Sequence, residues 1–175
     1  MTEKKTLVEL KAKIDDIDEV REKILKLNAK FVGKFRQIDT YFDVPKGRLK
    51  LREVEGNPSA QLIYYERENV AVPKKSEVFI LEISKPEEFK EKTEKILEIK
   101  SVVEKIREIY FYKGTKIHLD SVKKLGFFIE FEKETSLSEI EETKKFLKKL
   151  MEKLEIKPQN LMKSSYGELI LNANG

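Results

Sequence analysis

The chain has 175 residues, of which 36 are Lys or Arg and 32 are Asp or Glu, so its formal net charge is only +4. This length fits a single domain over residues 1–175 with a sizeable core, and the near balance of charge does not favour a nucleic-acid binder, which usually carries a one-sided basic excess. The sequence contains no cysteine, which excludes disulfides, thiolate metal sites and cysteine nucleophiles.

Residues 2–5 are polar, and Met1 to Lys5 begin no apolar run. We therefore expect neither a signal peptide nor a membrane span, and we expect a cytoplasmic protein. The abundance of Lys, Glu and Ile, with few glycines, is compatible with a thermophilic source.

The first half of the chain reads mainly as strands. Residues 6–14 alternate between polar and apolar, and a helix is predicted from Asp16 to about residue 30 because apolar residues recur there at helical spacing. Turns at Pro45 and at residues 56–58 separate the following segments. Further strands are predicted over residues 34–43, 47–54, 61–68 and 77–84.

The second half begins with a helix, predicted from Pro86 to about residue 100. Strands follow over residues 101–113, 116–122 and 126–133. A helix is predicted over residues 138–154, with Ser138 and Glu141 spaced as a capping box, and a short final helix over residues 161–171. The sequence thus predicts an α+β domain with about eight strands, the number at which an antiparallel sheet can close into a small barrel.

Charged residues occupy every second position in several predicted strands, and they are sorted by sign. Such alternation alone is typical of a sheet with one solvated face. Crowded like charges, however, repel one another unless a counter-ion is bound. Arginine forks match phosphate oxygens and paired carboxylates hold hard divalent cations, so the pattern favours a site for phosphate and metal. The sets are Arg48, Lys50 and Arg52; Glu130 and Glu132; and Glu9, Lys11 and Lys13.

Other polar residues give weaker signals. His118, the single histidine, is interpreted as structural, because a lone histidine makes a poor zinc site. Residues 37–43 alternate as well, which we interpret as a polar strand edge near Pro45. Of Tyr64 and Tyr65, at least one is expected to pack rather than stack on a ligand.

Seven short motifs occur in order along the chain. They are Val-Glu-Leu-Lys at 8–11, Gln-x-Asp-x-Tyr-Phe at 37–42, Gly-Arg-Leu-Lys-Leu-Arg-Glu at 47–53, Leu-Ile-Tyr-Tyr-Glu-Arg at 62–67, Lys-x-Arg-x-x-Tyr at 105–110, Ile-His-Leu-Asp at 117–120 and Leu-Gly-x-Phe-x-Glu-x-Glu at 125–132. Together they resemble the CYTH superfamily of triphosphate-tunnel proteins, which includes class IV adenylyl cyclases and thiamine-triphosphatases. The class IV cyclase-like branch fits best.

The resemblance implies a closed or nearly closed eight-stranded antiparallel barrel, open as a tunnel, with helices packed outside. It also implies a small-molecule triphosphate as partner, held with Mg²⁺ or Mn²⁺, and no membrane; a homodimer stays open. Glu9, Lys11, Glu130 and Glu132 would be catalytic. The implied metal ligands are Glu9, Asp120, Glu130 and Glu132. The implied phosphate contacts are Lys11, Lys13, Arg48, Lys50, Arg52, Arg67, Lys105 and Arg107.

One position departs from the family pattern. The first motif of the family is Glu-x-Glu-x-Lys, but its first Glu position is Leu7 here. A leucine cannot ligate a metal, so triphosphate binding is better supported than catalysis. The leading hypothesis is an enzyme that hydrolyses or cyclises a triphosphate. The alternative, which Leu7 favours, is a non-catalytic module that binds triphosphate or polyphosphate.

Overall fold

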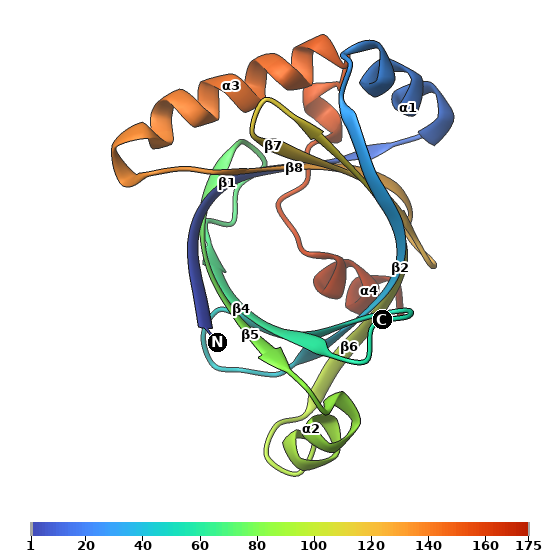
Figure 1. Cartoon of the computed structure of the whole chain (residues 1–175), viewed down its shortest axis with the longest axis vertical. Helices are drawn as coiled ribbons and strands as arrows, with labels where there is room; N and C mark the ends of the chain where they lie inside the picture. The colour runs from blue at the N-terminus through green and yellow to red at the C-terminus, as the bar shows by residue number, and fades with distance from the viewer. Residues whose placement is uncertain (1, 175) are drawn as a thin grey trace.

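The computed structural model describes residues 2–174. Eight strands close into one barrel in the order β1-β5-β4-β3-β2-β6-β7-β8, and every neighbouring pair is antiparallel (Figure 1). The predicted α+β barrel fold is confirmed. The strands are β1 (Thr2–Ile14), β2 (Lys30–Phe42), β3 (Arg48–Val54), β4 (Ala60–Arg67), β5 (Lys74–Ile83), β6 (Ile99–Tyr112), β7 (Thr115–Val122) and β8 (Gly126–Glu134).

Three of the four helices cover the outer face of the barrel (Figure 1). Helices α1 (Ile17–Lys26) and α3 (Ile140–Lys153) lie over β1, β7 and β8, and the shorter α2 (Pro86–Thr93) lies at the opposite side of the barrel. The fourth, α4 (Tyr166–Asn174), contacts the inner end of the barrel.

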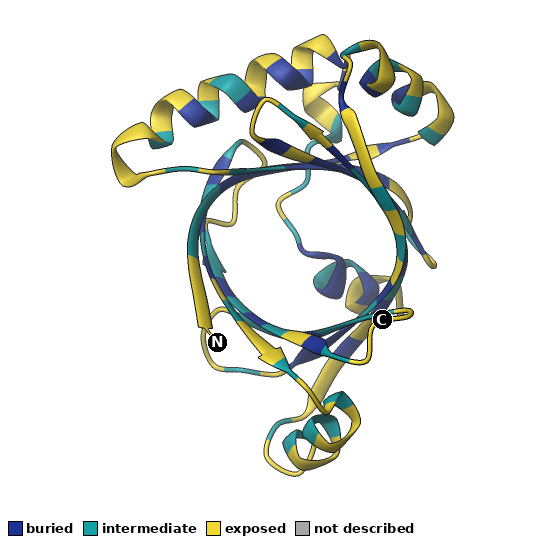
Figure 2. Ribbon diagram, in the orientation of Figure 1, coloured by how far each residue is buried: buried dark blue, intermediate teal, exposed yellow. Residues whose placement is uncertain are grey.

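The alternation in the strands places the main core outside the barrel wall. Outward residues of β1 such as Val8 and Leu10 pack against Leu147 and Leu150 of α3, and both faces are fully buried. Figure 2 shows the buried stripe along α3 facing the barrel while its other side is exposed. Since apolar side chains are buried outward, the opposite, polar positions of the same strands point into the barrel.

Helix α4 closes one end of the barrel. Tyr166 and Ile170 pack with Val103 and Phe128, which lie inside that end. The approach is close at Gly167, where an added Cβ would lie 2.9 Å from Cγ of Tyr41. A side chain at this position would therefore push α4 away from the barrel.

Several element ends differ from the sequence prediction. Helix α1 ends at Lys26 rather than near residue 30, because Asn28 adopts a φ of 60° that turns the chain into β2. Helix α2 ends at Thr93 rather than near residue 100. A 3₁₀ turn (Leu137–Glu139) precedes α3, so the predicted capping box does not form. The final helix starts at Tyr166 rather than 161, because Leu161 pairs with Ala12 as a β-bridge.

Among residues 2–174, no helix is both long and apolar enough to cross a membrane.

Candidate functional site

The barrel encloses a cavity of about 420 Å³, lined by inward side chains of all eight strands and by Tyr166 of α4. Its lining includes most of the charged residues singled out from the sequence. The prediction that alternating charges share the inner face of one barrel therefore agrees with the geometry, and the contacts below show how these charges are held.

One wall of the cavity gathers three cations around Asp39, a carboxylate with no exposure to solvent. Nε and Nη2 of Arg52 donate to its two oxygens at 2.8 Å each, Nζ of Lys105 donates at 2.9 Å, and Nζ of Lys50 lies 3.3 Å away. Although burial opposes it, these cations hold the pKa of Asp39 well below its usual range. The bidentate contact uses only two of the guanidinium donors, which leaves the Nη1 donors of Arg52 for another acceptor.

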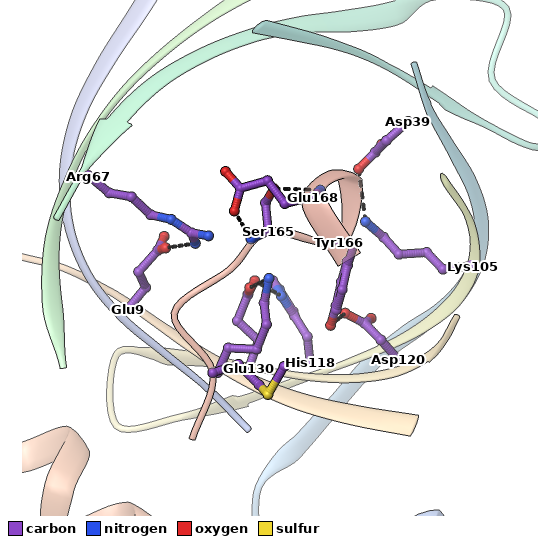
Figure 3. A network of polar contacts seen from close by, with 12 residues as sticks. Glu9, Asp39, Arg67, Lys105, His118, Asp120, Glu130, Ser165, Tyr166 and Glu168 are labelled. Carbon is purple, nitrogen blue, oxygen red and sulfur yellow. Dashed lines mark hydrogen bonds and ion pairs between the residues drawn. The ribbon is translucent and has the colours of Figure 1, made fainter. Parts of the chain in front are cut away.

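A second buried pair stands beside the first. Nε and Nη2 of Arg107 each donate to Asp120 at 2.8 Å, and the hydroxyl of Tyr166 donates to the same carboxylate at 2.7 Å (Figure 3). All these groups are buried. Asp120 therefore orients Arg107. It already accepts three hydrogen bonds and belongs neither to the cavity lining nor to the cluster with metal-ligand spacing, so its position does not favour the metal-ligand role that the resemblance implied.

Arg67 and Glu9 lie close together on the same side of the barrel interior (Figure 3), and Nη1 of Arg67 donates to the Glu9 carboxylate. Nε and Nη2 of Arg67 are buried but have no hydrogen-bond acceptor within residues 2–174. Because buried N–H groups are almost always paired, these two donors are available to an acceptor that enters the cavity. Lys11 lies nearby, with Nζ 3.9 Å from the ring centre of Tyr166 and 3.5 Å from Oε2 of Glu130.

The carboxylates of β8 form the one cluster in the described part of the chain with metal-ligand spacing. Ligand atoms of His118, Glu130 and Glu132 all lie within 4.8 Å of one another. Burial, together with the neighbouring charges of Glu130 and Glu9, raises the pKa of Glu132 to about 7. Burial and the charge of Arg107 lower the pKa of His118 to about 4, so its imidazole is neutral at pH 7.

This donor set fits a divalent cation. Burial and the charges of Glu130 and Glu9 raise the pKa of Glu132 even though Lys11 contacts Glu130 and Arg67 contacts Glu9, and a cation bound there would relieve this repulsion. A neutral imidazole and carboxylate oxygens are suitable ligands for Mn²⁺, and the carboxylates for Mg²⁺. Glu9 lines the same cavity, and its carboxylate accepts a hydrogen bond from Arg67.

The remaining predicted residues are placed as follows. Lys13 is exposed, with its Nζ 5.8 Å from the ring centre of Phe128, and does not line the cavity. Arg48 is held at the closed end by Glu168, whose Oε1 accepts from its Nη2 at 2.6 Å. Leu7 does line the cavity. The structure thus brings together Glu9, Lys11, Lys50, Arg52, Arg67, Lys105, Arg107, Glu130 and Glu132.

Several residues of the site escaped the sequence reasoning. The sequence predicts Asp39 as an edge residue, whereas the structure buries it beside the cavity; its alternation with Gln37 and Tyr41 is the signal that could have indicated this. Tyr64 faces outward and donates to Glu66, whereas Tyr65 lines the cavity. No sequence signal indicated that Tyr166 enters the barrel.

Lys74 was also missed. It is 1% exposed, and its Nζ donates to the carbonyl oxygens of Val70 at 2.9 Å and Met162 at 3.2 Å. It therefore ties the loop after β4 to the segment that leads into α4. Its side chain anchors the backbone rather than the cavity.

The CYTH domain family matches residues 3–166 of this chain. The chain belongs to the CYTH domain family. It is 34% identical over 179 aligned residues to a protein of Methanocaldococcus jannaschii provisionally named an adenylate cyclase, covering 93% of this chain and 97% of that protein.

Solved structures of similar proteins agree with this CYTH fold. The PH1012 protein of Pyrococcus horikoshii OT3 has a TM-score of 0.85 at 28% identity, covering 93% of this chain and 98% of the other. A protein of Hippeastrum, provisionally called an adenylyl cyclase and described as having a dominant triphosphatase activity, has a TM-score of 0.65. At 15% identity, over 97% of this chain and 96% of that one, it shows a shared fold alone.

Proposed function

We propose that this CYTH protein is a divalent-metal-dependent enzyme that binds a triphosphate inside the barrel and cleaves one of its phosphorus–oxygen bonds. The name of the M. jannaschii relative supports cyclisation of ATP to cyclic AMP. The dominant triphosphatase activity described for the Hippeastrum protein indicates that the fold is also compatible with hydrolysis.

The proposal rests on two nitrogen atoms of Arg67, Nε and Nη2, that have no hydrogen-bond acceptor among residues 2–174. These two nitrogens are buried in the cavity, next to a cationic wall and a carboxylate cluster. A triphosphate would supply the oxygens that these donors lack, and a cation bound beside Glu132 would offset the added negative charge. No other arrangement among the described residues combines buried unpaired N–H groups with potential metal ligands in one cavity.

The residues of the chain divide into two roles. Arg52, Arg67 and Arg107 would bind phosphate oxygens with the donors that their carboxylate partners leave free. Glu130 and Glu132, with His118, would hold Mg²⁺ or Mn²⁺; when bound, such a cation supplies charge neutralisation at the phosphoryl oxygens. The buried carboxylates Asp39 and Asp120 would keep the cations oriented before the substrate arrives, so that little reorganisation accompanies charge development.

Two reactions use the same arrangement. In hydrolysis, water attacks the terminal phosphorus in line, the bond to the bridging oxygen breaks and the diphosphate part of the substrate leaves, so that the attacked phosphorus becomes orthophosphate. In cyclisation, the ribose 3′-hydroxyl attacks the α-phosphorus and pyrophosphate leaves. The same cationic wall would stabilise the leaving oxygen in either case. Which group attacks would then depend on the position of the organic part of the substrate in the cavity.

A second candidate is a module that binds a triphosphate without turnover. Leu7 favours it, because a leucine lines the cavity where the family pattern has a carboxylate, and the acidic residues of β1 are then Glu9 and the more distant Glu3. Fewer carboxylates reduce the number of metal contacts and with them the stabilisation of a phosphoryl transition state.

Product analysis separates these functions. The protein is incubated with ATP, thiamine triphosphate or inorganic triphosphate, with Mg²⁺, with Mn²⁺ or with a chelator. Cyclic AMP plus pyrophosphate identifies a cyclase and orthophosphate a hydrolase, in either case only in the presence of metal. Tight metal-dependent binding without any product would identify the binding module and overturn the enzyme.

A further inference from the structure

We propose that the barrel cavity contains an apolar subsite, built from Leu7, Ile63, Val78 and Ile80, that takes the non-phosphate group of an organic triphosphate and makes inorganic triphosphate a poorer ligand. This inference rests on the proposed function, because it presupposes a triphosphate in the tunnel. It assigns a role to Leu7 that is independent of metal binding.

The four residues come from three neighbouring strands and meet on one wall of the cavity. Ile63 of β4 and Ile80 of β5 are directly paired across the strands, and Val78 and Ile63 pack with Leu7 in one apolar cluster. All four line the cavity rather than the helix-covered outer face. Because this cluster faces the space inside the barrel, its partner in the ligand-bound state is the ligand itself.

An apolar wall is a poor surface for phosphate. An anion placed against it loses water without gaining a hydrogen bond, whereas an apolar or aromatic group gains from leaving water. A cavity meant only for a chain of phosphates would present donors on all sides. Here Leu7, Ile63, Val78 and Ile80 make one aliphatic stretch of the wall formed by β1, β5 and β4. It is bordered on β1 by Glu3 and Lys5, while most of the other donors lie on β3, β6 and β7, in Lys11 of β1 and in Arg67 of β4.

Three residues of the apolar subsite lie further along the strands than Arg67, whereas Leu7 is level with Arg67, since both are paired with Ser76. Leu7 is the next inward position after Glu9 on β1, and Ile63 is two inward positions from Arg67 on β4. One inward step along a strand is about 7 Å. A ligand whose phosphates contact Arg67 would therefore place a group attached to the phosphate chain beside Leu7 and Ile63.

Two unpaired side-chain oxygen atoms of the described residues line the cavity, and one of them lies beside this cluster. Oγ of Ser76, which is paired with Leu7 across the strands, and Oε1 of Gln37 are buried without a hydrogen-bond partner in residues 2–174, and both residues line the cavity. An apolar pocket with a few placed polar groups is the usual composition of a site for a small organic molecule. The organic group that fits carries hydrogen-bonding atoms as well as an apolar face, as a nitrogen heterocycle does.

The test compares organic with inorganic ligands in matched variants. Affinities for ATP, GTP, CTP, UTP, thiamine triphosphate and inorganic triphosphate are measured by isothermal titration with Ca²⁺ as the divalent cation. The wild type is expected to bind at least one organic triphosphate about tenfold more tightly than inorganic triphosphate. Its heat-capacity change should be more negative with that ligand, because apolar surface is buried.

The Leu7→Glu variant places a carboxylate in the apolar cluster and should weaken the preferred organic ligand by about tenfold, the cost expected for one lost aliphatic contact. Its affinity for inorganic triphosphate should change less than twofold. Leu81→Glu is the control, because Leu81 is 37% exposed on the outer face of β5. If Leu7→Glu does not fold, Val78→Thr keeps the side-chain shape and should weaken the organic ligand by about threefold.

Equal affinity for inorganic and organic triphosphates, or equal weakening of both by Leu7→Glu, would overturn the apolar subsite while leaving the proposed function intact. Failure of every triphosphate to bind would overturn the proposed function instead. Tighter binding of inorganic triphosphate by Leu7→Glu would also overturn the subsite, since it would identify Leu7 as a missing metal ligand.

Discussion

The hydroxyl of Tyr166 donates a 2.7 Å hydrogen bond to Asp120, a residue 46 positions earlier in the chain. The same carboxylate holds Arg107 by two bonds of 2.8 Å. Helix α4 is therefore linked through one buried carboxylate to a cation of the proposed phosphate site. The same carboxylate, Asp120, therefore helps both to hold α4 at the end of the barrel and to orient Arg107.

Replacing Tyr166 by Phe removes this bond but keeps the ring against Phe128, where the two centroids are 5.0 Å apart. We expect the free energy of unfolding to fall by about 1 kcal/mol, the usual net value of one hydrogen bond. The KM for triphosphate should rise, because Arg107 loses part of its support. Urea denaturation and initial rates measure the two effects. An unchanged KM would show that Tyr166 acts on stability alone.

Gly167 provides a stricter test of the closed end. Gly167→Ala introduces a Cβ 2.9 Å from Cγ of Tyr41 and 3.0 Å from Oγ of Ser101. Since this packing leaves no room, α4 must shift, and we expect a larger loss of stability than in Tyr166→Phe. Equal or greater stability of Gly167→Ala in urea denaturation would contradict the tight docking of α4.

The raised pKa of Glu132 predicts a pH-dependent stability in the metal-free protein. Its usual pKa is 4.5, and burial beside Glu130 and Glu9 raises it to about 7. Between these values the folded state binds more protons than the unfolded state, so the free energy of unfolding should fall as the pH rises through this window. Glu132→Gln should flatten that decline in thermal denaturation with EDTA. A decline of the same slope in the variant would contradict the assignment.

Metal binding should depend on the carboxylates of β8. We expect Glu130→Gln to lose most Mn²⁺ binding in electron paramagnetic resonance titrations and at least about 100-fold in turnover. Exposed Glu142→Gln, on α3, is the matched control and should behave as wild type. Thermal stabilisation by Mn²⁺ should likewise be lost in Glu130→Gln only. Full Mn²⁺ affinity in this variant would place the metal elsewhere.

The pKa of Lys50 predicts that the affinity for triphosphate decreases at alkaline pH. Burial, followed by the charge of Arg52, lowers the pKa of Lys50 to about 8. The side chain is therefore charged below pH 8 and neutral above it, so affinity should fall as the pH rises from 7 to 9. Lys50→Arg stays charged and should lose less affinity over this range, measured by titration at each pH. A steeper loss in the variant would exclude Lys50 from phosphate binding.

The barrel itself was predictable from the sequence because its strands carry strict alternation. Apolar residues such as Val8 and Leu10 had to be buried on one side, which fixed Glu9 and Lys11 on the other. The same argument placed Arg52 and Glu130 in the interior once the strands were known to close.

Long-range contacts were not predictable in the same way. Asp39 looks like an ordinary edge residue until β3 and β6 bring Arg52 and Lys105 to it from both sides. The entry of Tyr166 into the barrel depends on a bend that no periodicity encodes. Lys13 follows the alternation of β1, yet it is exposed, because periodicity gives the face of a strand but not how far the enclosed cavity extends.

The most direct test of the central claim is a crystal structure with Mn²⁺ and a non-hydrolysable triphosphate, in which anomalous scattering locates the metal. The account predicts an Mn²⁺ peak beside Glu130 and Glu132, with phosphate oxygens within hydrogen-bond distance of Nε or Nη2 of Arg67. A triphosphate bound outside the barrel, or an Mn²⁺ peak remote from both carboxylates, would contradict it.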